Sequence, residues 1–435
     1  MGLRSICVLG LGYIGLPTAA TLAANGISVL GVDTNQKILD TLNSDEIHIE
    51  ETGLREAYLA ARRSGRFQVA ARPAEADAFL IAVPTPFYSD RSGEYQGLAY
   101  KLADLRAVES AAKSIVPLLR KGNLVLLEST SPPRTTVDRL APILGHSGLE
   151  PGRDFHLAYS PERVLPGRIL HELTENARVV GGITPESARA AAELYAIFVK
   201  GEIIQTDSTT AELVKLMENS YRDVNIAMAN EFSRLAARFG VDVWEAISLA
   251  NRHPRVRILD PGPGVGGHCI SVDPWFLVES APELTSLIAA ARRLNDSQPQ
   301  FVVDLVSRAL GTLDGKRIAA LGLAYKANVD DVRESPAAEV VRLLEAGGAA
   351  VKSWEPHRPD ASVEGVPMAP SLDAAVHDAD AIVLLVSHRE FLDLQPGALL
   401  AATPARTIVD AVNGWGGQEW SLAGFRMFRL GAVNP

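Results

Sequence analysis

Short apolar runs alternate with segments of helical periodicity along the first part of the chain, residues 1–200. The apolar runs occupy residues 5–10, 27–33, 78–83 and 124–128. Buried strands that leave room for crossover helices between them are typical of a doubly wound parallel sheet. The pattern therefore predicts a Rossmann-like α/β domain over residues 1–200.

Unbroken helical periodicity replaces this pattern between about Ser208 and Arg252. The apolar positions spaced for one helix face are Leu213, Leu216, Met217, Ile226, Phe232, Leu235 and Ala236. We therefore expect a long central helix within a second domain over residues 201–300. Residues 260–267 are too rich in glycine and proline for the interior of a helix or strand, so they predict a loop.

A second α/β pattern follows in residues 301–435. Residues 316–322 resemble a first buried strand, and further strand-like runs lie at 350–354, 381–386 and 407–410. The whole chain is therefore predicted to be an α/β protein with two Rossmann-like doubly wound domains joined by a long central helix and a helical region.

Length and charge restrict the classes of function. A chain of 435 residues exceeds what one hydrophobic core usually supports. The formal net charge of −10 argues against a surface that tracks nucleic acid or anionic lipid, and the apolar runs are too short to cross a bilayer. With only Cys7 and Cys269 present, a disulfide scaffold is not expected. We expect a cytoplasmic protein in a reducing compartment, with no membrane or nucleic-acid partner.

A glycine-rich turn follows the first predicted strand, and an aspartate follows the second. Such glycines let the backbone approach a pyrophosphate at a helix N-terminus, while the carboxylate accepts hydrogen bonds from ribose hydroxyls. An ordinary strand-to-helix turn is the alternative. Because no arginine adjoins Asp33 to hold a 2′-phosphate, NAD is expected rather than NADP. The candidate cofactor residues here are Gly10, Gly12, Tyr13, Ile14, Gly15 and Asp33.

Two threonines lie just beyond further predicted strands, Thr85 and Thr130. Sheets of this type bind ligands at the carboxyl ends of their strands. Both hydroxyls are therefore candidates to contact the nicotinamide half of the cofactor, with ordinary turn chemistry as the alternative.

Cys269 lies on the glycine-rich loop, whereas Cys7 lies within an apolar run. A thiol beside bare backbone amides can be approached by a substrate and act as a nucleophile. A packing role is equally compatible with its position alone. The residues by themselves leave both possibilities open.

Three ordered motifs carry a resemblance to the UDP-glucose/GDP-mannose dehydrogenase family. They are KLMENS at 215–220, GVGGHCISVDP at 264–274 and GLAYK at 322–326. The resemblance extends from the first glycine motif to the last domain. It implies an NAD-dependent enzyme that oxidises the primary alcohol of a nucleotide sugar to a carboxylate.

Other segments resemble the branch of that family that acts on UDP-N-acetyl-D-mannosamine. They are PERVLPGR at 161–168 and RDVNIA at 222–227, supported by NRHPR at 251–255. Pro166 stands where UDP-glucose dehydrogenases carry a second glutamate, so the role of that carboxylate is not carried over. The branch implies UDP-N-acetyl-D-mannosaminuronate as product, for surface polysaccharide synthesis.

The resemblance also implies roles in catalysis. Cys269 would attack the intermediate aldehyde to give a thiohemiacetal and then a thioester, so that two NAD are consumed per sugar. Lys215 would move a proton or stabilise the alkoxide, and Asn219, one helical turn away, would donate to an oxyanion. Asp273 would orient water or share a proton with Lys215. Glu162 would be the base for thioester hydrolysis, and Thr130 would hold the water.

Substrate contacts and a subunit contact follow from the same resemblance. The residues implied near the nucleotide sugar are Arg163, Val164, Lys215, Asn219, Arg222, His253, Arg255, Gly266, Tyr325 and Lys326. Arg255 would reach the neighbouring subunit's site, which implies a homodimer or higher homo-oligomer with a helical dimerisation region. Arg333 would contact NAD, although an ion pair with Asp330 or Asp331 is the alternative.

No metal is expected, because the histidines His146, His171, His357, His377 and His388 form no metal-ligand spacing. UDP-N-acetylglucosamine, UDP-glucose and GDP-mannose remain alternative substrates. A two-electron dehydrogenase of the 6-phosphogluconate or 3-hydroxyacid kind is the alternative enzyme. An NAD-binding sensor or scaffold is the non-catalytic alternative.

Overall fold

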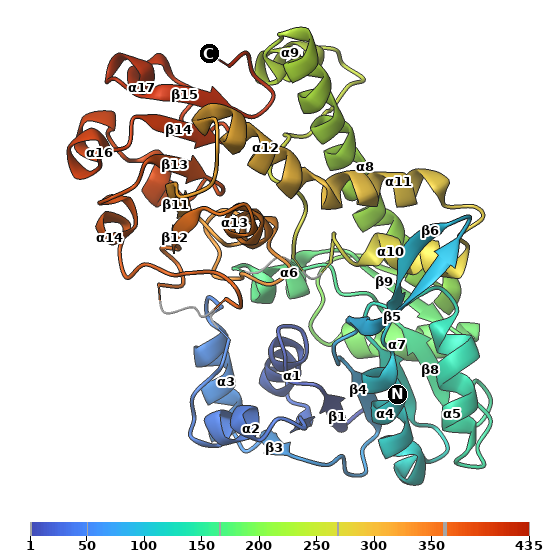
Figure 1. Ribbon diagram of the computed structural model, residues 1–435. Coiled ribbons are helices and arrows are strands. Elements are labelled where there is room, and N and C mark those ends of the chain that lie inside the picture. Colours follow the sequence, from blue (N-terminus) through green and yellow to red (C-terminus); the bar gives the residue numbers. More distant parts are fainter. Residues whose placement is uncertain (1, 50, 165–166, 268, 360–362, 435) are drawn as a thin grey trace. The chain divides into compact units, whose positions relative to one another are not determined.

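The computed structural model describes residues 2–49, 51–164, 167–267, 269–359 and 363–434 (Figure 1). The chain divides into two compact units. The first consists of Met1–Glu218 with Trp275–Leu284, and the second of Asn219–Pro274 with Thr285–Pro435.

An eight-stranded sheet forms the centre of the first unit, in the order β10-β9-β8-β7-β4-β1-β2-β3. Its neighbouring strands run parallel except for the pair β8 and β9. The strands are β1 Ser5–Leu9, β2 Ser28–Val32, β3 Phe67–Ala70, β4 Ala78–Ile81, β7 Leu124–Leu127, β8 His156–Tyr159, β9 Arg178–Gly182 and β10 Ile203–Asp207. Strands β4 and β7 are buried at every position, which explains their continuous apolar sequence.

Alternate residues of β1 face two separate cores, because successive side chains of a strand point to opposite faces. Ile6 and Val8 belong to one core, whereas Cys7 and Leu9 belong to the other. The first core is covered by α1 Gly15–Ala24, α3 Leu54–Arg63, α6 Ile169–Glu175 and α7 Pro185–Tyr195. The second is covered by α4 Arg106–Ile115, the π-helix η2 Thr135–Leu140 and α5 Ala141–Gly145. Helix α2 Gln36–Asn43, the 3₁₀ turn η1 Val116–Leu118 and the hairpin β5 Phe87–Tyr95 and β6 Leu98–Ala103 complete the unit.

The predicted long helix is α8, Ser208–Phe239, which has 32 residues. The expectation of unbroken periodicity to Arg252 was wrong. Gly240 follows the helix with a φ of 68°, and Asp242 then caps a separate helix, α9 Val243–Ala250, by accepting from two backbone N–H groups. Helices α10 Asp273–Ser280, α11 Ser286–Asp296 and α12 Gln298–Leu310 follow, and residues 260–267 form the predicted loop.

The second unit contains a five-stranded parallel sheet in the order β12-β11-β13-β14-β15. Its strands are β11 Arg317–Leu321, β12 Ala350–Trp354, β13 Ala381–Leu384, β14 Thr407–Asp410 and β15 Arg426–Arg429. Helices α12 and α13 Pro336–Ala346 pack in the core on one face of the sheet. The other core takes in α14 Leu372–Val376, α15 Arg389–Leu392, α16 Pro396–Ala402 and α17 Gln418–Leu422.

Both sheets begin with the same turn. Gly10 and Gly322 have φ values of 93° and 90° after the first strand of their sheets. The Gly10 N–H donates to Val32 at 2.8 Å, and the Gly322 N–H donates to Trp354 at 3.0 Å. The predicted fold, two Rossmann-like domains with a long central helix, is confirmed. Within the residues that the structure covers, no helix combines the length and apolar character needed to span a membrane.

Candidate active site

The glycines of the first turn have different tasks. A Cβ on Gly10 would lie 2.5 Å from the Ala82 carbonyl oxygen, and one on Gly15 would lie 1.8 Å from the Gly10 oxygen. A Cβ on Gly12 would meet no atom within 4 Å. Gly10 and Gly15 are therefore required by packing, whereas Gly12 leaves open space beside the backbone where a ligand can approach.

The start of α1 fits an anionic ligand. Its N-cap residue, Ile14, offers no side-chain acceptor to the first backbone N–H groups, and the first turn contains no acidic residue. Tyr13 and Ile14 are half-buried beside this end of the helix. Asp33 accepts from the Leu11 N–H at 3.0 Å and from the Asn35 N–H at 2.8 Å, which places its carboxylate against the turn. These residues fit the diphosphate and ribose of NAD.

Thr85 and Thr130 are brought together at the carboxyl ends of the adjacent strands β4 and β7. The Thr85 hydroxyl donates to the Thr130 carbonyl at 2.8 Å, and both residues are half-buried. The Ser129 hydroxyl donates to the Val83 carbonyl at 2.7 Å, which joins the same two loops. Thr130 is therefore held in position by its neighbours.

A buried carboxylate of α8 holds the segment that follows Thr130. Glu212 accepts from the Thr136 N–H at 2.8 Å, from the Thr136 hydroxyl at 2.6 Å and from the Arg134 N–H at 2.5 Å. Burial raises the pKa of Glu212 to about 7, although the hydrogen bonds from Thr136 oppose this shift. Sequence patterns did not indicate this contact.

Glu162 belongs to a buried ionic cluster. Its Oε2 lies 2.5 Å from Nη2 of Arg178, and its Oε1 accepts from the Arg163 N–H at 2.6 Å. Arg178 also lies 3.3 Å from Glu128, which accepts from the Tyr195 hydroxyl. Burial raises the pKa of Glu128 to about 7 despite the nearby Arg178. The candidate base is thus tied to an arginine that the sequence analysis did not single out.

Other residues of the same segment are engaged within the first unit. Nη1 of Arg163 lies 2.8 Å from Glu218, and its Nη2 donates to the Ala177 carbonyl. Val164 is half-buried. Leu165 and Pro166 lie outside the described residues, so the expectation that Pro166 replaces a second glutamate stays a prediction from the sequence.

Lys215 and Asn219 lie one turn apart on α8, and both are buried, with 7% and 8% of their surface exposed. A solvated lysine beside a surface asparagine was the alternative, and burial argues against it. Their catalytic roles remain predictions.

The structure brings Asn219, Asp273 and the cysteine loop together in the second unit. Nδ2 of Asn219 donates to Oδ2 of Asp273 at 2.6 Å. The Asp273 N–H donates to the Cys269 carbonyl at 2.8 Å, which places the exposed Cys269 just ahead of α10. His268 lies outside the described residues.

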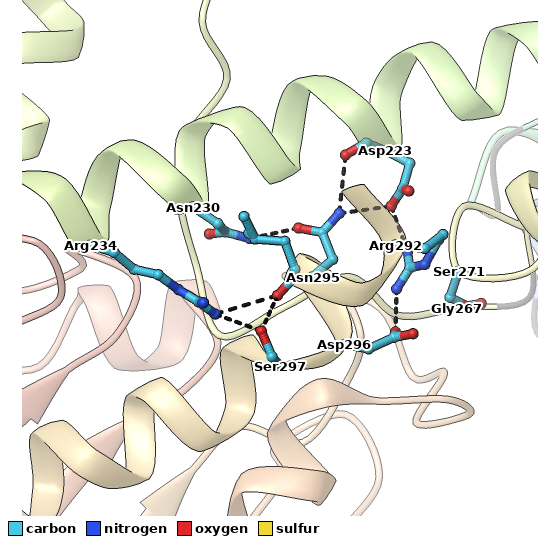
Figure 2. Close-up of polar contacts among 10 residues, drawn as sticks. Asp223, Asn230, Arg234, Gly267, Ser271, Arg292, Asn295, Asp296 and Ser297 are labelled. Atoms are coloured by element: carbon cyan, nitrogen blue, oxygen red, sulfur yellow. Dashed lines mark hydrogen bonds and ion pairs between the residues drawn. The ribbon is translucent and has the colours of Figure 1, made fainter. Parts of the chain in front are cut away.

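A buried polar cluster joins α8 to α11, as Figure 2 shows, and one of its members also binds the glycine-rich loop. Asp223 accepts from Arg292 at 2.5 Å and from Asn295 at 2.8 Å. Asn295 accepts from Asn230 at 2.9 Å, and Oδ1 of Asn230 accepts from the Gly262 N–H at 2.9 Å. Direct hydrogen bonds between protein groups thus connect α8, α11 and the loop.

The loop also packs closely against the turn that follows β11. A Cβ on Gly266 would lie 2.4 Å from the Glu334 carbonyl oxygen, and one on Gly267 would lie 2.9 Å from the Tyr325 ring. Burial raises the pKa of Tyr325, and the neighbouring charges of Asp331 and Cys269 raise it further. Side chains at the two glycines would therefore separate Tyr325 from the cysteine loop.

A pocket lies between this loop and the second sheet. It is lined by Pro263, Gly264, Ala324, Tyr325, Lys326, Ala327, Pro336, Ala337, Leu385, Val386, Ser387 and Val412. Arg222 is exposed on α8, and its positive charge acts to lower the pKa of Tyr325, against the effect of burial. Of the predicted substrate residues, Tyr325 and Lys326 thus line a pocket, and Gly266 lies beside it.

Three predicted contacts lie elsewhere in the second unit. His253 and Arg255 are exposed on the turn after α9, where Nδ1 of His253 accepts from the Arg255 N–H at 3.3 Å. Arg333 makes two hydrogen bonds to Asp331, at 2.7 and 2.8 Å, which is the ion pair considered as the alternative to NAD binding. Their roles toward ligands and a partner stay predictions.

One histidine cluster departs from the sequence expectation. Potential ligand atoms of His357, His388 and Glu390 lie within 4.8 Å of one another. However, Nδ1 of His388 accepts from the Asn328 N–H at 2.9 Å, and its Nε2 lies 3.1 Å from Glu355. Both ring nitrogens of His388 are therefore in use, so the cluster offers a metal only two side chains. The absence of a metal stays a prediction.

Comparisons with known proteins cover almost the whole chain. The NAD binding, central and UDP binding domains of the UDP-glucose/GDP-mannose dehydrogenase family match residues 4–199, 209–297 and 319–416. An NDP-N-acetyl-D-galactosaminuronic acid dehydrogenase of Ralstonia solanacearum is 47% identical over 95% of this chain and 96% of its own.

Two further relatives carry the name of one substrate. A UDP-N-acetyl-D-mannosamine dehydrogenase of Escherichia coli strain K12 is 47% identical over 90% of this chain and 95% of its own. The solved UDP-D-ManNAc dehydrogenase of Pyrococcus horikoshii superposes with a TM-score of 0.90 at 39% identity, over 99% of this chain and all of that one. The chain therefore belongs to the UDP-glucose/GDP-mannose dehydrogenase family of NAD-dependent nucleotide-sugar dehydrogenases.

Proposed function

We propose that this protein oxidises carbon 6 of UDP-N-acetyl-D-mannosamine to a carboxylate, giving UDP-N-acetyl-D-mannosaminuronate with the reduction of two NAD. The observation that carries the proposal is the exposed Cys269, which lies next to Asp273 and its partner Asn219. A simple two-electron oxidation of an alcohol needs no such thiol. The names of the Escherichia coli and Pyrococcus horikoshii relatives support the choice of sugar.

The chain's own residues would carry the first oxidation as follows. NAD, when bound at the first glycine turn, would supply the hydride acceptor for carbon 6 in both oxidation steps. Lys215 takes the hydroxyl proton, or stabilises the alkoxide as that proton leaves. Asn219 has a second amide N–H besides the one given to Asp273, so it can also donate to the developing oxyanion.

Cys269 would retain the aldehyde. Its thiolate forms a C–S bond to the aldehyde carbon, and the aldehyde oxygen takes up a proton to give a thiohemiacetal. Transfer of a second hydride to a second NAD, with the hydroxyl proton passing to Lys215, would leave a thioester. Water then attacks the carbonyl carbon, the C–S bond breaks, and the thiolate leaves as the carboxylate forms. Asp273, fixed by Asn219, would orient this water or exchange a proton with Lys215.

Glu162 would act as the base for the final hydrolysis. Its Oε2 lies 2.5 Å from Nη2 of Arg178 and its Oε1 accepts from the Arg163 N–H at 2.6 Å, so both carboxylate oxygens are held in position. Thr130, whose carbonyl is held by the Thr85 hydroxyl, would help to hold that water.

The proposed ligand contacts fall into a cofactor set and a substrate set. The turn of Gly10 to Gly15 and Asp33 would hold NAD, with Arg333 completing that site. Tyr325 and Lys326 would contact the nucleotide sugar in their pocket, where the lysine meets the diphosphate. Arg163, Val164, Arg222, His253 and Gly266 would add contacts to the substrate.

A homodimer, or a higher homo-oligomer, would complete the site by receiving Arg255 from a neighbouring subunit. Apolar side chains exposed along α8 support this proposal, since such a face is typical of a protein interface. They are Leu213, Met217, Tyr221, Met228, Phe232, Leu235 and Phe239. Equilibrium sedimentation should give a mass of twice the chain mass or a higher multiple.

The nucleophilic thiol requires a reducing environment, so we place the enzyme in the cytoplasm. Its product, a nucleotide-activated uronic acid, is a glycosyl donor of the kind used in surface polysaccharide synthesis.

The test is the number of NADH molecules formed for each nucleotide sugar consumed. It should be run in parallel on UDP-N-acetylmannosamine, UDP-N-acetylglucosamine, UDP-glucose and UDP-N-acetylgalactosamine. Two NADH per sugar, with the highest kcat/KM for the mannosamine substrate, is the expected result. One NADH, or turnover with none of the sugars, would contradict the proposal.

An N-acetylgalactosamine derivative is the second candidate substrate, because the Ralstonia solanacearum relative is named for that series. The two sugars differ in the orientation of substituents on the ring, and one hydrogen bond that reads such a difference contributes about 1 kcal/mol. A higher kcat/KM with UDP-N-acetylgalactosamine would select this candidate.

A further inference from the structure

The two Rossmann-like domains carry corresponding carboxylates. Asp33 follows β2 and accepts N–H groups from Asn35, two residues on, and from Leu11, which follows the turn glycine. Glu355 follows β12 and makes the same two kinds of contact. It accepts from His357, two residues on, at 3.1 Å and from Leu323, after Gly322, at 2.7 Å.

The two carboxylates differ in what else reaches them. Asp33 is half-buried, so a ligand can still donate to it. Glu355 is fully buried and its Oε2 receives two more donors from the protein, the Ala324 N–H at 2.9 Å and Nε2 of His388 at 3.1 Å. His388 and the backbone thus use the acceptor capacity of Glu355, whereas Asp33 can still accept from a ligand.

The hydrogen bonds fix the tautomer of His388. Its Nδ1 accepts from the Asn328 N–H at 2.9 Å, so the ring proton must be on Nε2, which donates to Glu355. A carboxylate and a neutral imidazole therefore form a closed network of fixed polarity.

This network fixes both ends of the turn that follows β11. Leu323 and Ala324 are bound to Glu355 at one end, and Asn328 is bound to His388 at the other. Asn328 has a φ of 61°, and its side chain accepts from the Arg389 N–H at 2.9 Å. Tyr325, Lys326 and Ala327, which line the pocket, lie between these anchors.

We propose that Glu355 and His388 are positioning residues for the nucleotide sugar, which hold the turn of residues 323–328 so that Tyr325 and Lys326 face the ligand. They act through the backbone and do not touch the substrate. This inference rests on the proposed function, because it takes Lys326 as a contact to the diphosphate. It also gives a reason for burying a carboxylate and an imidazole where apolar residues would be easier to accommodate.

Three variants separate the two hydrogen bonds of the ring. H388N keeps an acceptor near the position of Nδ1, H388Q keeps a donor near the position of Nε2, and H388A keeps neither. H377N is the matched control, since His377 is exposed after α14 of the same domain. For each protein, the Kd of UDP, the Kd of NAD, and kcat and KM for the nucleotide sugar are measured.

We expect the Kd of UDP and the KM of the sugar to rise about tenfold or more in H388A, which corresponds to a loss of about 1.4 kcal/mol of binding free energy. The rise should be smaller in H388N and in H388Q, because each keeps one of the two hydrogen bonds. The Kd of NAD should stay within about twofold in every variant, because its turn lies in the other Rossmann-like domain. H377N should behave like the parent. A merely structural role would lower the amount of folded enzyme without this selective change.

Amide hydrogen exchange gives a reading that does not depend on activity. The Asn328 amide should exchange slowly in the parent protein and about tenfold faster in H388A and H388Q, but not in H388N. Unchanged Kd and KM in folded H388A would overturn the proposal, and if H388A does not fold, the same result in H388N and H388Q would do so. If the parent protein binds no nucleotide sugar, the proposed function fails, and the exchange rates alone then decide whether the turn is held as described.

Discussion

The side-chain amide of Asn219 donates to Asp273 at 2.6 Å, and this contact joins the central helix to the helix that follows the cysteine loop. Asp273 in turn donates its backbone N–H to Cys269 at 2.8 Å. Because Asp273 is 1% exposed, the pair is shielded from bulk water. The backbone of Cys269 is thus anchored beside an amide and a carboxylate that come from two different helices.

Asp273→Asn should keep this hydrogen-bonded arrangement, because an amide has nearly the shape of the carboxylate and can still accept from Asn219. It removes the negative charge and the proton acceptor. We expect kcat to fall about 100-fold, with little change in the thermal unfolding midpoint. Asp304→Asn, an exposed substitution on α12, serves as the control. An unchanged kcat would mean that the carboxylate has no part in proton transfer.

Cys269→Ser should abolish formation of the carboxylate, since a serine hydroxyl is a much weaker nucleophile toward the aldehyde. Residual turnover should yield at most one NADH per sugar. In the parent protein, iodoacetamide should label Cys269 and spare Cys7. Cys7 is fully buried, and burial raises the pKa of its thiol to about 11. Peptide mass spectrometry reads the labelling. A serine variant that makes the uronate at the parent rate would disprove the covalent mechanism.

The buried Glu212 should make stability fall as the pH rises. Its pKa is raised from 4.5 in the unfolded chain to about 7 in the folded protein, so the folded state holds the extra proton between these values. Raising the pH across this window therefore favours unfolding, by about 3 kcal/mol for a shift of this size.

Glu212→Gln has no proton to lose, so its free energy of unfolding in urea should drop less than the parent's between pH 5 and pH 8. The pH dependence of the variant is compared with that of the parent, because other buried carboxyl groups contribute to both. Burial also raises the pKa of Glu128 and of Asp223, the latter to about 6. Glu283→Gln, at an exposed position, should leave the parent's pH dependence unchanged. Equal slopes in Glu212→Gln and the parent would show that Glu212 titrates normally.

Arg292→Met should destabilise the second unit by about 3–5 kcal/mol, because Asp223 would be left buried without its counter-ion. Both side chains are wholly buried in the parent protein. Combining it with Asp223→Asn removes the unpaired charge and should restore part of the loss. Urea unfolding of the two single variants and the double variant measures the coupling. Strictly additive effects would show that the ion pair is not coupled.

The elements set by local sequence were predictable. The buried strands β1, β4 and β7 have continuous apolar runs, and the turns of Gly10 and Gly322 follow strands as the pattern indicated. The end of α8 was missed because the apolar periodicity continues through Gly240 into α9, while the break depends on a glycine with positive φ and on the cap formed by Asp242. The hairpin β5 and β6 was also missed, since its strands are largely exposed and lack a clear alternation.

The candidate site was predictable where motifs carry it, as at Cys269, and not where distant residues meet. Glu128 and Arg178 are separated by 50 positions, and Asp223 and Arg292 by 69, so no spacing rule connects them. The sequence does offer one signal for this cluster. Arg178 begins a buried strand, and a buried charge needs an oppositely charged partner. Arg333 shows the converse, a residue selected by motif whose observed contact is an ion pair with Asp331.

Helix α8 carries Lys215 and Asn219 on buried positions and an exposed apolar stripe on others. If a second copy of the chain covers that stripe, the same helix supports both subunit association and catalysis. Dilution that dissociates the assembly would then lower the activity of the enzyme. Specific activity would then depend on protein concentration, and an assay run far below the dissociation constant of the assembly would report on a different species from the one present at higher concentration.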